Sequence, residues 1–234
     1  WTFYSQTLLC LVPLLMVYFA LPETLRARRP ERLTLASMPR IYSGLMSEPA
    51  YRNYVAIVTL TYAGLFSFIS ASSFVLQGVY GWSEVAFGLA FGICSVSYIS
   101  GTFAGTRLVK LIGLAASVRF GAALLATGGV AMVALMSIGL DNPFALVATM
   151  MIYMVGVGIA LPHSVAAALT FYPDRAGAAS SLLGFVQMSF GAIVGIIVGH
   201  AFNNSAWPLA IALASAGLLA FLISILRRRI ADPE

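Results

Sequence analysis

Charged side chains are scarce in this sequence. They make up 9% of the 234 residues, whereas a soluble domain averages about 25%, and hydrophobic residues make up 60%. Long stretches carry no charge at all. This composition argues against a water-soluble domain and favours a protein embedded in lipid.

Cysteine and catalytic motifs are equally sparse. The two cysteines, Cys10 and Cys94, lie in apolar stretches without a CxxC or histidine partner, which is typical of small apolar core residues. HExxH, GxSxG and phosphate-loop motifs are absent, and the apolar stretches contain no close pair of carboxylates. The sequence therefore argues against an enzyme and predicts neither a metal site nor a cofactor.

Apolar segments long enough to cross a bilayer are abundant. A hydrocarbon core of about 30 Å needs about 20 apolar residues of helix. The segments that qualify are Thr2–Leu21, Tyr54–Val79, Val85–Thr106, Val118–Leu140, Phe144–Phe171, Ala178–Phe202 and Trp207–Leu226. We therefore expect an all-α membrane protein with seven transmembrane helices.

Basic residues fall on one side of these crossings. The loops on the opposite side, 80–84, 141–143 and 203–206, contain the acids Glu84 and Asp141 but no Lys or Arg. Because cytoplasmic loops are enriched in basic residues, the chain is expected to start outside and to end in the cytoplasm. The net charge of +5 reflects this orientation and does not point to nucleic acid. A multi-pass membrane protein is expected, with the lipid bilayer as partner.

One long connection divides the chain. Residues 22–50 are polar, basic and rich in proline, which predicts a cytoplasmic linker, with a short interfacial helix at Ile41–Met46. Residues 1–21 then form one helix of a preceding half, and residues 51–234 form a six-helix unit with short loops. Since the sequence lacks an initiating Met and has an odd number of crossings, we expect the N-terminal part of a longer protein to be missing.

Small residues and proline mark helix contacts. Gly184, Gly191, Gly195 and Gly199 favour close helix packing, because small residues let two backbones approach. Pro162 frees a backbone carbonyl in its helix, and Ser164 is placed to satisfy it, so a kink near Leu161 is expected.

Ionisable groups inside the spans are almost confined to two histidines. His163 lies beside Pro162, and His200 lies at the outer end of its helix. His163 is either a substrate or proton contact or a histidine bonded within the bundle. Proton coupling cannot be derived from these residues.

A set of aromatic, sulfur-containing and uncharged polar side chains predicts a cavity. Tyr62, Phe66, Ser70, Ser73 and Gln77 recur at three- or four-residue spacing, so they share one helix face. Such a cavity suits small amphipathic organic molecules better than sugars, which need many polar partners. The other candidates for its lining are Met150, Tyr153, Met154, His163 and Gln187. Core packing or contact with lipid is the alternative for each of these residues.

Several strings resemble one family of transporters. Pro22–Leu25, Tyr62–Ala71, Ala176–Gly184 and Asn204–Pro208 resemble the Bcr/CflA drug-resistance branch of the major facilitator superfamily. The resemblance implies that residues 51–234 are the C-terminal six-helix half of that fold. It further implies a multidrug efflux pump of a bacterial inner membrane that exchanges drugs for protons, with two halves rocking about a central cavity.

The same resemblance implies a gating loop and a missing partner half. Gly101, Gly105, Arg107, Lys110 and Gly113 look like a degenerate copy of the superfamily's cytoplasmic gating motif, without its acidic member. The proton-carrying acids of such pumps belong to the N-terminal half. The residues leave two other readings open, which are an importer of a small polar nutrient and a membrane subunit that does not transport.

Overall fold

The computed structural model describes residues 2–20 and 38–226, and these residues are almost entirely helical. The long helices are α1 (Thr2–Ala20), α3 (Pro49–Ser73), α4 (Glu84–Ile112), α5 (Leu114–Ser137), α6 (Pro143–Thr170), α7 (Ala176–His200) and α8 (Trp207–Leu226). Shorter elements are α2 (Met38–Met46), the π-helical segment Phe74–Val79 that prolongs α3, and a 3₁₀ turn at Pro173–Arg175. Within the described ranges, seven helices are long and apolar enough to span a membrane, which confirms the predicted number of transmembrane helices.

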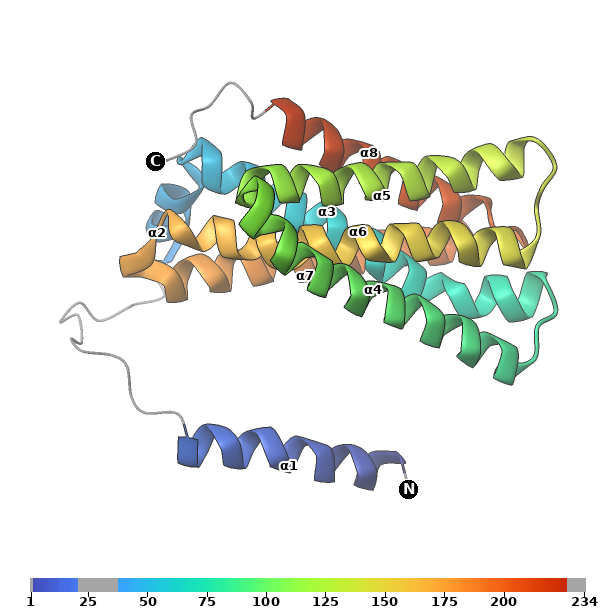
Figure 1. Cartoon of the computed structure of the whole chain (residues 1–234), viewed down its shortest axis with the longest axis horizontal. Coiled ribbons are helices and arrows are strands. Elements are labelled where there is room, and N and C mark those ends of the chain that lie inside the picture. The colour runs from blue at the N-terminus through green and yellow to red at the C-terminus, as the bar shows by residue number, and fades with distance from the viewer. Residues whose placement is uncertain (1, 21–37, 227–234) are drawn as a thin grey trace. The chain divides into compact units, whose positions relative to one another are not determined.

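Contacts divide the chain between Met38 and Pro39 into two compact units. In the first, α1 is a single apolar helix with Pro13 inside it. The second contains α3 to α8 (Figure 1). The predicted interfacial helix is present as α2, and it packs on the six-helix unit: Leu45 is 1% exposed, and Tyr172 donates a hydrogen bond to its carbonyl at 3.1 Å. In this division residues 39–50 belong to the same unit as α3 to α8. Residues 22–37 of the predicted linker lie outside the described residues.

The six helices are arranged as two related sets of three. α3 packs on α6, α5 packs on α8, and these four surround the core; α4 lies outside on α6, and α7 lies outside on α3 (Figure 1). Exchanging α3–α4–α5 for α6–α7–α8 reproduces these pairings. Because α3 and α6 start at opposite ends of the bundle, the two sets have inverted topology, an arrangement common in transporters.

The two ends of this unit differ in charge. The described basic residues Arg40, Arg52, Arg107, Lys110, Arg119 and Arg175 lie at the end where α3, α5 and α7 begin, which we call the basic end. Glu84 and Asp141 lie at the opposite end, where α4 and α6 begin. These six described cations thus lie on one side of the bundle, as the sequence predicts.

Caps and glycines set the helix ends. Ser83 and Asn142 cap α4 and α6, and each side chain accepts a hydrogen bond from a backbone N–H of the first turn. Gly113 has a φ of +81°, a backbone conformation that glycine adopts without strain, and it separates α4 from α5. α4 continues past the predicted end at Thr106 to Ile112. Arg107 and Lys110 are therefore part of the helix, which ends at Gly113.

Only some of the glycines predicted at helix contacts lie against a neighbouring described helix. A Cβ added at Gly191 or at Gly195 would lie 2.9 Å from a ring of α3, whereas one added at Gly184 or Gly199 would meet none of the described residues within 4 Å. α6 remains helical through Pro162. Ser164 is buried without a hydrogen-bond partner, so the expected help to the freed carbonyl is wrong.

Candidate functional site

α3 and α7 run side by side in a fixed register. Tyr51 donates a hydrogen bond to the carbonyl of Ala179 at 2.7 Å, and the two residues are 128 positions apart. Tyr62 donates to the sulfur of Met188 at 3.1 Å, 126 positions apart. Because both contacts have nearly the same offset, the two helices are parallel and in register. The side of α3 predicted to line a cavity therefore runs along α7, and we call this contact the α3–α7 seam.

Glycines on α7 make room for aromatic rings of α3 in this seam. The closest atoms to a Cβ at Gly191 would belong to Tyr62, and those at Gly195 would belong to Phe66 and Ser70. The rings of Tyr62 and Phe66 stack at a centroid distance of 6.0 Å, and both side chains are half-buried. The seam thus presents a stacked aromatic pair, with the Met188 thioether beside it.

One buried side-chain oxygen on each of these two helices has no hydrogen-bond partner among the described residues. The Gln187 side-chain oxygen and the Thr59 hydroxyl are both buried without a hydrogen bond. The offset between the two helices places Thr59 at about the height of Gln187 along their axes. Burial of an unpaired polar group costs about 1–3 kcal/mol, so a hydrogen-bond partner for either oxygen would be stabilising.

Gln187 lies near the middle of α7, and so near the middle of the bundle. Gln187 is 11 residues after the start of α7 at Ala176 and 13 before its end at His200. At 1.5 Å per residue, these separations are about 17 and 20 Å. Thr59 was missed from the sequence, although it lies three residues before Tyr62 and therefore shares its helix face.

Gln77 is separated from this polar pair. Its side-chain nitrogen donates to the Ser73 hydroxyl at 2.8 Å, within the π-helical end of α3. The amide nitrogen is thus bonded inside its own helix near the end opposite the basic end. π-helical segments are frequent at functional sites, and this one lies where α3 turns toward α4.

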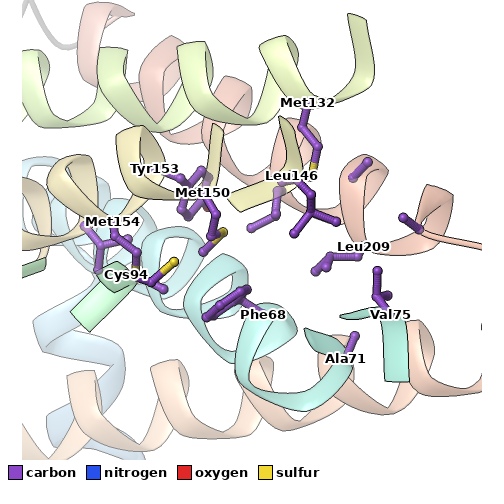
Figure 2. Close-up of a cluster of buried hydrophobic side chains, with 14 of the residues drawn as sticks. Phe68, Ala71, Val75, Cys94, Met132, Leu146, Met150, Tyr153, Met154 and Leu209 are labelled. Atoms are coloured by element: carbon purple, nitrogen blue, oxygen red, sulfur yellow. The ribbon is translucent and has the colours of Figure 1, made fainter. Parts of the chain in front are cut away.

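Met150, Tyr153 and Met154 do not line an accessible cavity. They are 0%, 0% and 4% exposed, inside the main hydrophobic core, where Figure 2 shows them beside Phe68 and Cys94. The prediction is wrong for these three residues because α6 is an inner helix that contacts α3, α4 and α5.

His163 lies against the predicted gating motif. Its Nδ1 is 2.6 Å from the Ile159 carbonyl, which can only accept a hydrogen bond, so Nδ1 carries the proton. A Cβ at Gly105 would lie 2.6 Å from the His163 ring. The half-buried histidine thus occupies the notch that Gly105 leaves in α4, and it is bonded within the bundle.

The predicted gating loop is mostly helix. Gly101 and Gly105 are buried in α4 against α6, Arg107 and Lys110 are exposed on the last turns of α4, and Gly113 alone separates two helices. The expectation of a loop is therefore wrong. Among the described residues, no acid forms an ion pair with Arg107 or Lys110.

Comparisons with known proteins identify one family. A model of the Major Facilitator Superfamily matches residues 1–196. The chain is 28% identical over 221 residues to a bicyclomycin resistance protein homolog of Haemophilus influenzae, covering 94% of this chain and 55% of that protein. It is 30% identical over 188 residues to the uncharacterized MFS-type transporter YdgK of Bacillus subtilis, covering 79% and 46%.

A solved structure supports the fold. The crystal structure of a bacterial homologue of the iron transporter ferroportin, in an outward-facing state, matches with a TM-score of 0.67 at 20% identity, over 86% of this chain and 50% of that one. The chain spans about half the length of the curated relatives it matches. Since the family model covers well over half of the sequence, the chain belongs to the Major Facilitator Superfamily.

Proposed function

We propose that this chain forms one half of a secondary active exporter of small amphipathic organic molecules, of the Bcr/CflA type. The observation that carries the proposal is the α3–α7 seam at the middle of the bundle. There, the rings of Tyr62 and Phe66 stack, and the oxygens of Thr59, three residues before Tyr62, and of Gln187, next to the Met188 that Tyr62 contacts, have no hydrogen-bond partner among the described residues. Transporters of this architecture bind substrate near the bilayer midplane, at the interface of repeats.

The chemistry of the seam favours amphipathic ligands. Aromatic faces and a thioether attract apolar and polarisable groups, whereas the two unpaired oxygens offer few polar contacts. A sugar would leave most of its hydroxyls unpaired in such surroundings, at a cost for each group. A ligand with a planar apolar body and one or two hydrogen-bond donors fits best, which disfavours an importer of a polar nutrient.

The relatives support export. One relative is named for resistance to bicyclomycin, and 94% of this chain aligns with it, although identity is 28%. We propose drug:proton antiport as the mechanism, as the resemblance to Bcr/CflA transporters implies. The described spans hold no carboxylate at mid-depth, so the proposal places the proton carrier outside these spans.

Drug tolerance of cells that express the intact protein tests export. Expression in a drug-sensitive bacterium should raise tolerance to several amphipathic drugs, and Tyr62→Ala and Gln187→Leu should each reduce that gain several-fold. Val130→Ala, at an exposed position on α5, is the control and should leave the gain unchanged. Unchanged tolerance to all drug classes on expression of the intact protein would contradict export.

Inverted membrane vesicles test the coupling. Addition of a transported drug should dissipate a preformed proton gradient in vesicles that contain the intact protein. The Tyr62→Ala variant should lose most of this response. Drug uptake that persists without a proton gradient would contradict antiport and leave export itself intact.

A further inference from the structure

An apolar groove lies between α7 and α8, with its floor on α3. Its volume is about 480 Å³, within the range of about 300–1,000 Å³ typical of small-molecule sites. α7 and α8 line its walls at three- and four-residue spacing, and Leu60 and Ala63 of α3 form part of its floor. It is separate from the stacked rings of the seam, because neither Tyr62 nor Phe66 lines it.

The interior of the groove offers almost nothing to a polar ligand. Ser215 is the one hydroxyl in its lining, and its Oγ already donates to the Ala212 carbonyl at 3.1 Å. The remaining walls are aliphatic and aromatic, apart from Asn203 at the end opposite the basic end. The part of a ligand that enters must therefore be pure hydrocarbon, because any polar group would remain unpaired.

The length of the groove matches one leaflet. It extends along α8 from Trp207 to Leu219, which are 12 residues apart. At 1.5 Å per residue, this is about 18 Å, and half of a hydrocarbon core is about 15 Å. The groove thus reaches from one membrane surface to about the midplane.

The rim of the groove presents hydrogen-bond donors. The Asn203 side-chain oxygen accepts a hydrogen bond from Ser205 at 2.6 Å, which leaves the amide nitrogen to donate outward. The indole N–H of Trp207 can also only donate, and tryptophan favours the headgroup level of a bilayer. Ester and phosphate oxygens of a lipid are acceptors, so the rim is complementary to them.

We propose that this groove holds one acyl chain of a phospholipid from the leaflet at the end opposite the basic end. The ester and phosphate groups of the lipid lie at Asn203 and Trp207, and the chain end lies at Leu60 and Leu219. Because the described loops at this end carry no Lys or Arg, binding does not depend on a negatively charged headgroup. This inference is independent of the direction and substrate of transport.

Photocrosslinking in proteoliposomes of the intact protein tests the proposal. The probe is a phosphatidylethanolamine with a diazirine near the end of one acyl chain. Crosslinks should concentrate on peptides that contain Leu60, Phe190 and Leu219, and labelling should saturate at about one lipid per protein. Labelling that is spread evenly over all lipid-facing helices, or that never saturates, would overturn it.

Two variants and a control sharpen the result. Ala212→Trp fills the groove and should reduce this labelling several-fold, whereas Leu218→Trp, on the same helix and outside the groove, should not. Asn203→Asp keeps the acceptor for Ser205 but removes the outward donors, and it should also reduce labelling without a change to the bundle. Equal labelling of the Asn203→Asp and Ala212→Trp variants and the parent would overturn the proposal, as would crosslinks that show α1 or a second protein copy in the groove.

Discussion

Gly101 of α4 and Gly158 of α6 lie where these two helices touch backbone to backbone. A Cβ added at Gly158 would come within 2.8 Å of the Thr102 amide nitrogen, and one added at Gly101 would come within 2.9 Å of the Val155 Cα. Backbone atoms cannot move aside as a side-chain end can. The two glycines therefore set the distance between the outer helix α4 and the inner helix α6.

Substitution at this crossing should destabilise the protein. Gly158→Ala forces α4 away from α6, and overpacking of this kind costs about 1–3 kcal/mol. Thermal unfolding of the purified intact protein measures the effect. The control is Gly92→Ala on α4, where nothing lies within 4 Å, and it should unfold at the parental temperature or slightly above. Equal unfolding temperatures for the two variants would contradict the tight crossing.

Substitution in the α3–α7 seam should affect transport more than stability. A Cβ at Gly191 meets the ring of Tyr62, a side chain that can move, so Gly191→Ala should change stability by less than about 1 kcal/mol. It should displace the ring and change drug tolerance several-fold. Gly184→Ala, with open space around it, is the matched control in the same helix. If both variants confer parental tolerance, the position of the Tyr62 ring does not matter for transport.

The start of α6 depends on its cap. The Asn142 side-chain oxygen accepts a hydrogen bond from the Ala145 amide at 2.9 Å. Asn142→Ala should lower the free energy of unfolding by about 1 kcal/mol, and Asn142→Asp should retain most of it, because aspartate caps equally well. Chemical unfolding of the three proteins in one detergent measures the difference. If Asn142→Asp lost as much stability as Asn142→Ala, the helix cap would not be the cause of the loss.

The hydrogen bond between Tyr80 and Asp141 should make the stability of the protein depend on pH in the alkaline range. Burial, the hydrogen bond that Tyr80 donates to Asp141, and the charge of that carboxylate raise the pKa of Tyr80 above its ordinary value near 10. The folded state then keeps a proton that the unfolded state releases, so this stabilisation is complete below pH 10 and is lost as pH rises toward the raised pKa.

The Tyr80→Phe variant isolates this contribution. It should be less stable than the parent by about 1 kcal/mol at pH 8, a modest figure because the pair is partly exposed. The difference in stability between the parent and the variant should narrow between pH 10 and pH 11. Thermal unfolding across this range would measure it. A gap that stays constant with pH would mean that the phenol and the carboxylate are not coupled.

The helices could be predicted from the sequence because a helix that crosses a bilayer must be long and apolar. Hydropathy found the core of each span, but it could not find the ends of α4 or α3. α4 continues through Arg107 and Lys110 because hydrogen bonding and Gly113, rather than hydropathy, end the helix. α3 begins at Pro49, where Glu48 provides the cap.

The candidate site was only partly predictable. Spacing correctly placed Tyr62 and Phe66 on one face of α3, and the structure adds that this face lies along α7. It could not show that Tyr153 is buried, because in a membrane protein the core, the lipid-facing surface and a cavity all favour apolar and aromatic side chains. Thr59 was missed because threonine is common in membrane helices, and only the register with Gln187 makes it notable.

The reactivity of a cysteine introduced in the seam tests most directly whether it faces a substrate cavity. In the intact protein without Cys10, Gln187→Cys and Phe66→Cys should react with a water-soluble thiol reagent, and a transported drug should slow the reaction. Cys94, which is 1% exposed in the core, is the internal control and should stay unreactive throughout. If both introduced cysteines are as unreactive as Cys94 in every condition, the seam is not a substrate cavity and the account is contradicted.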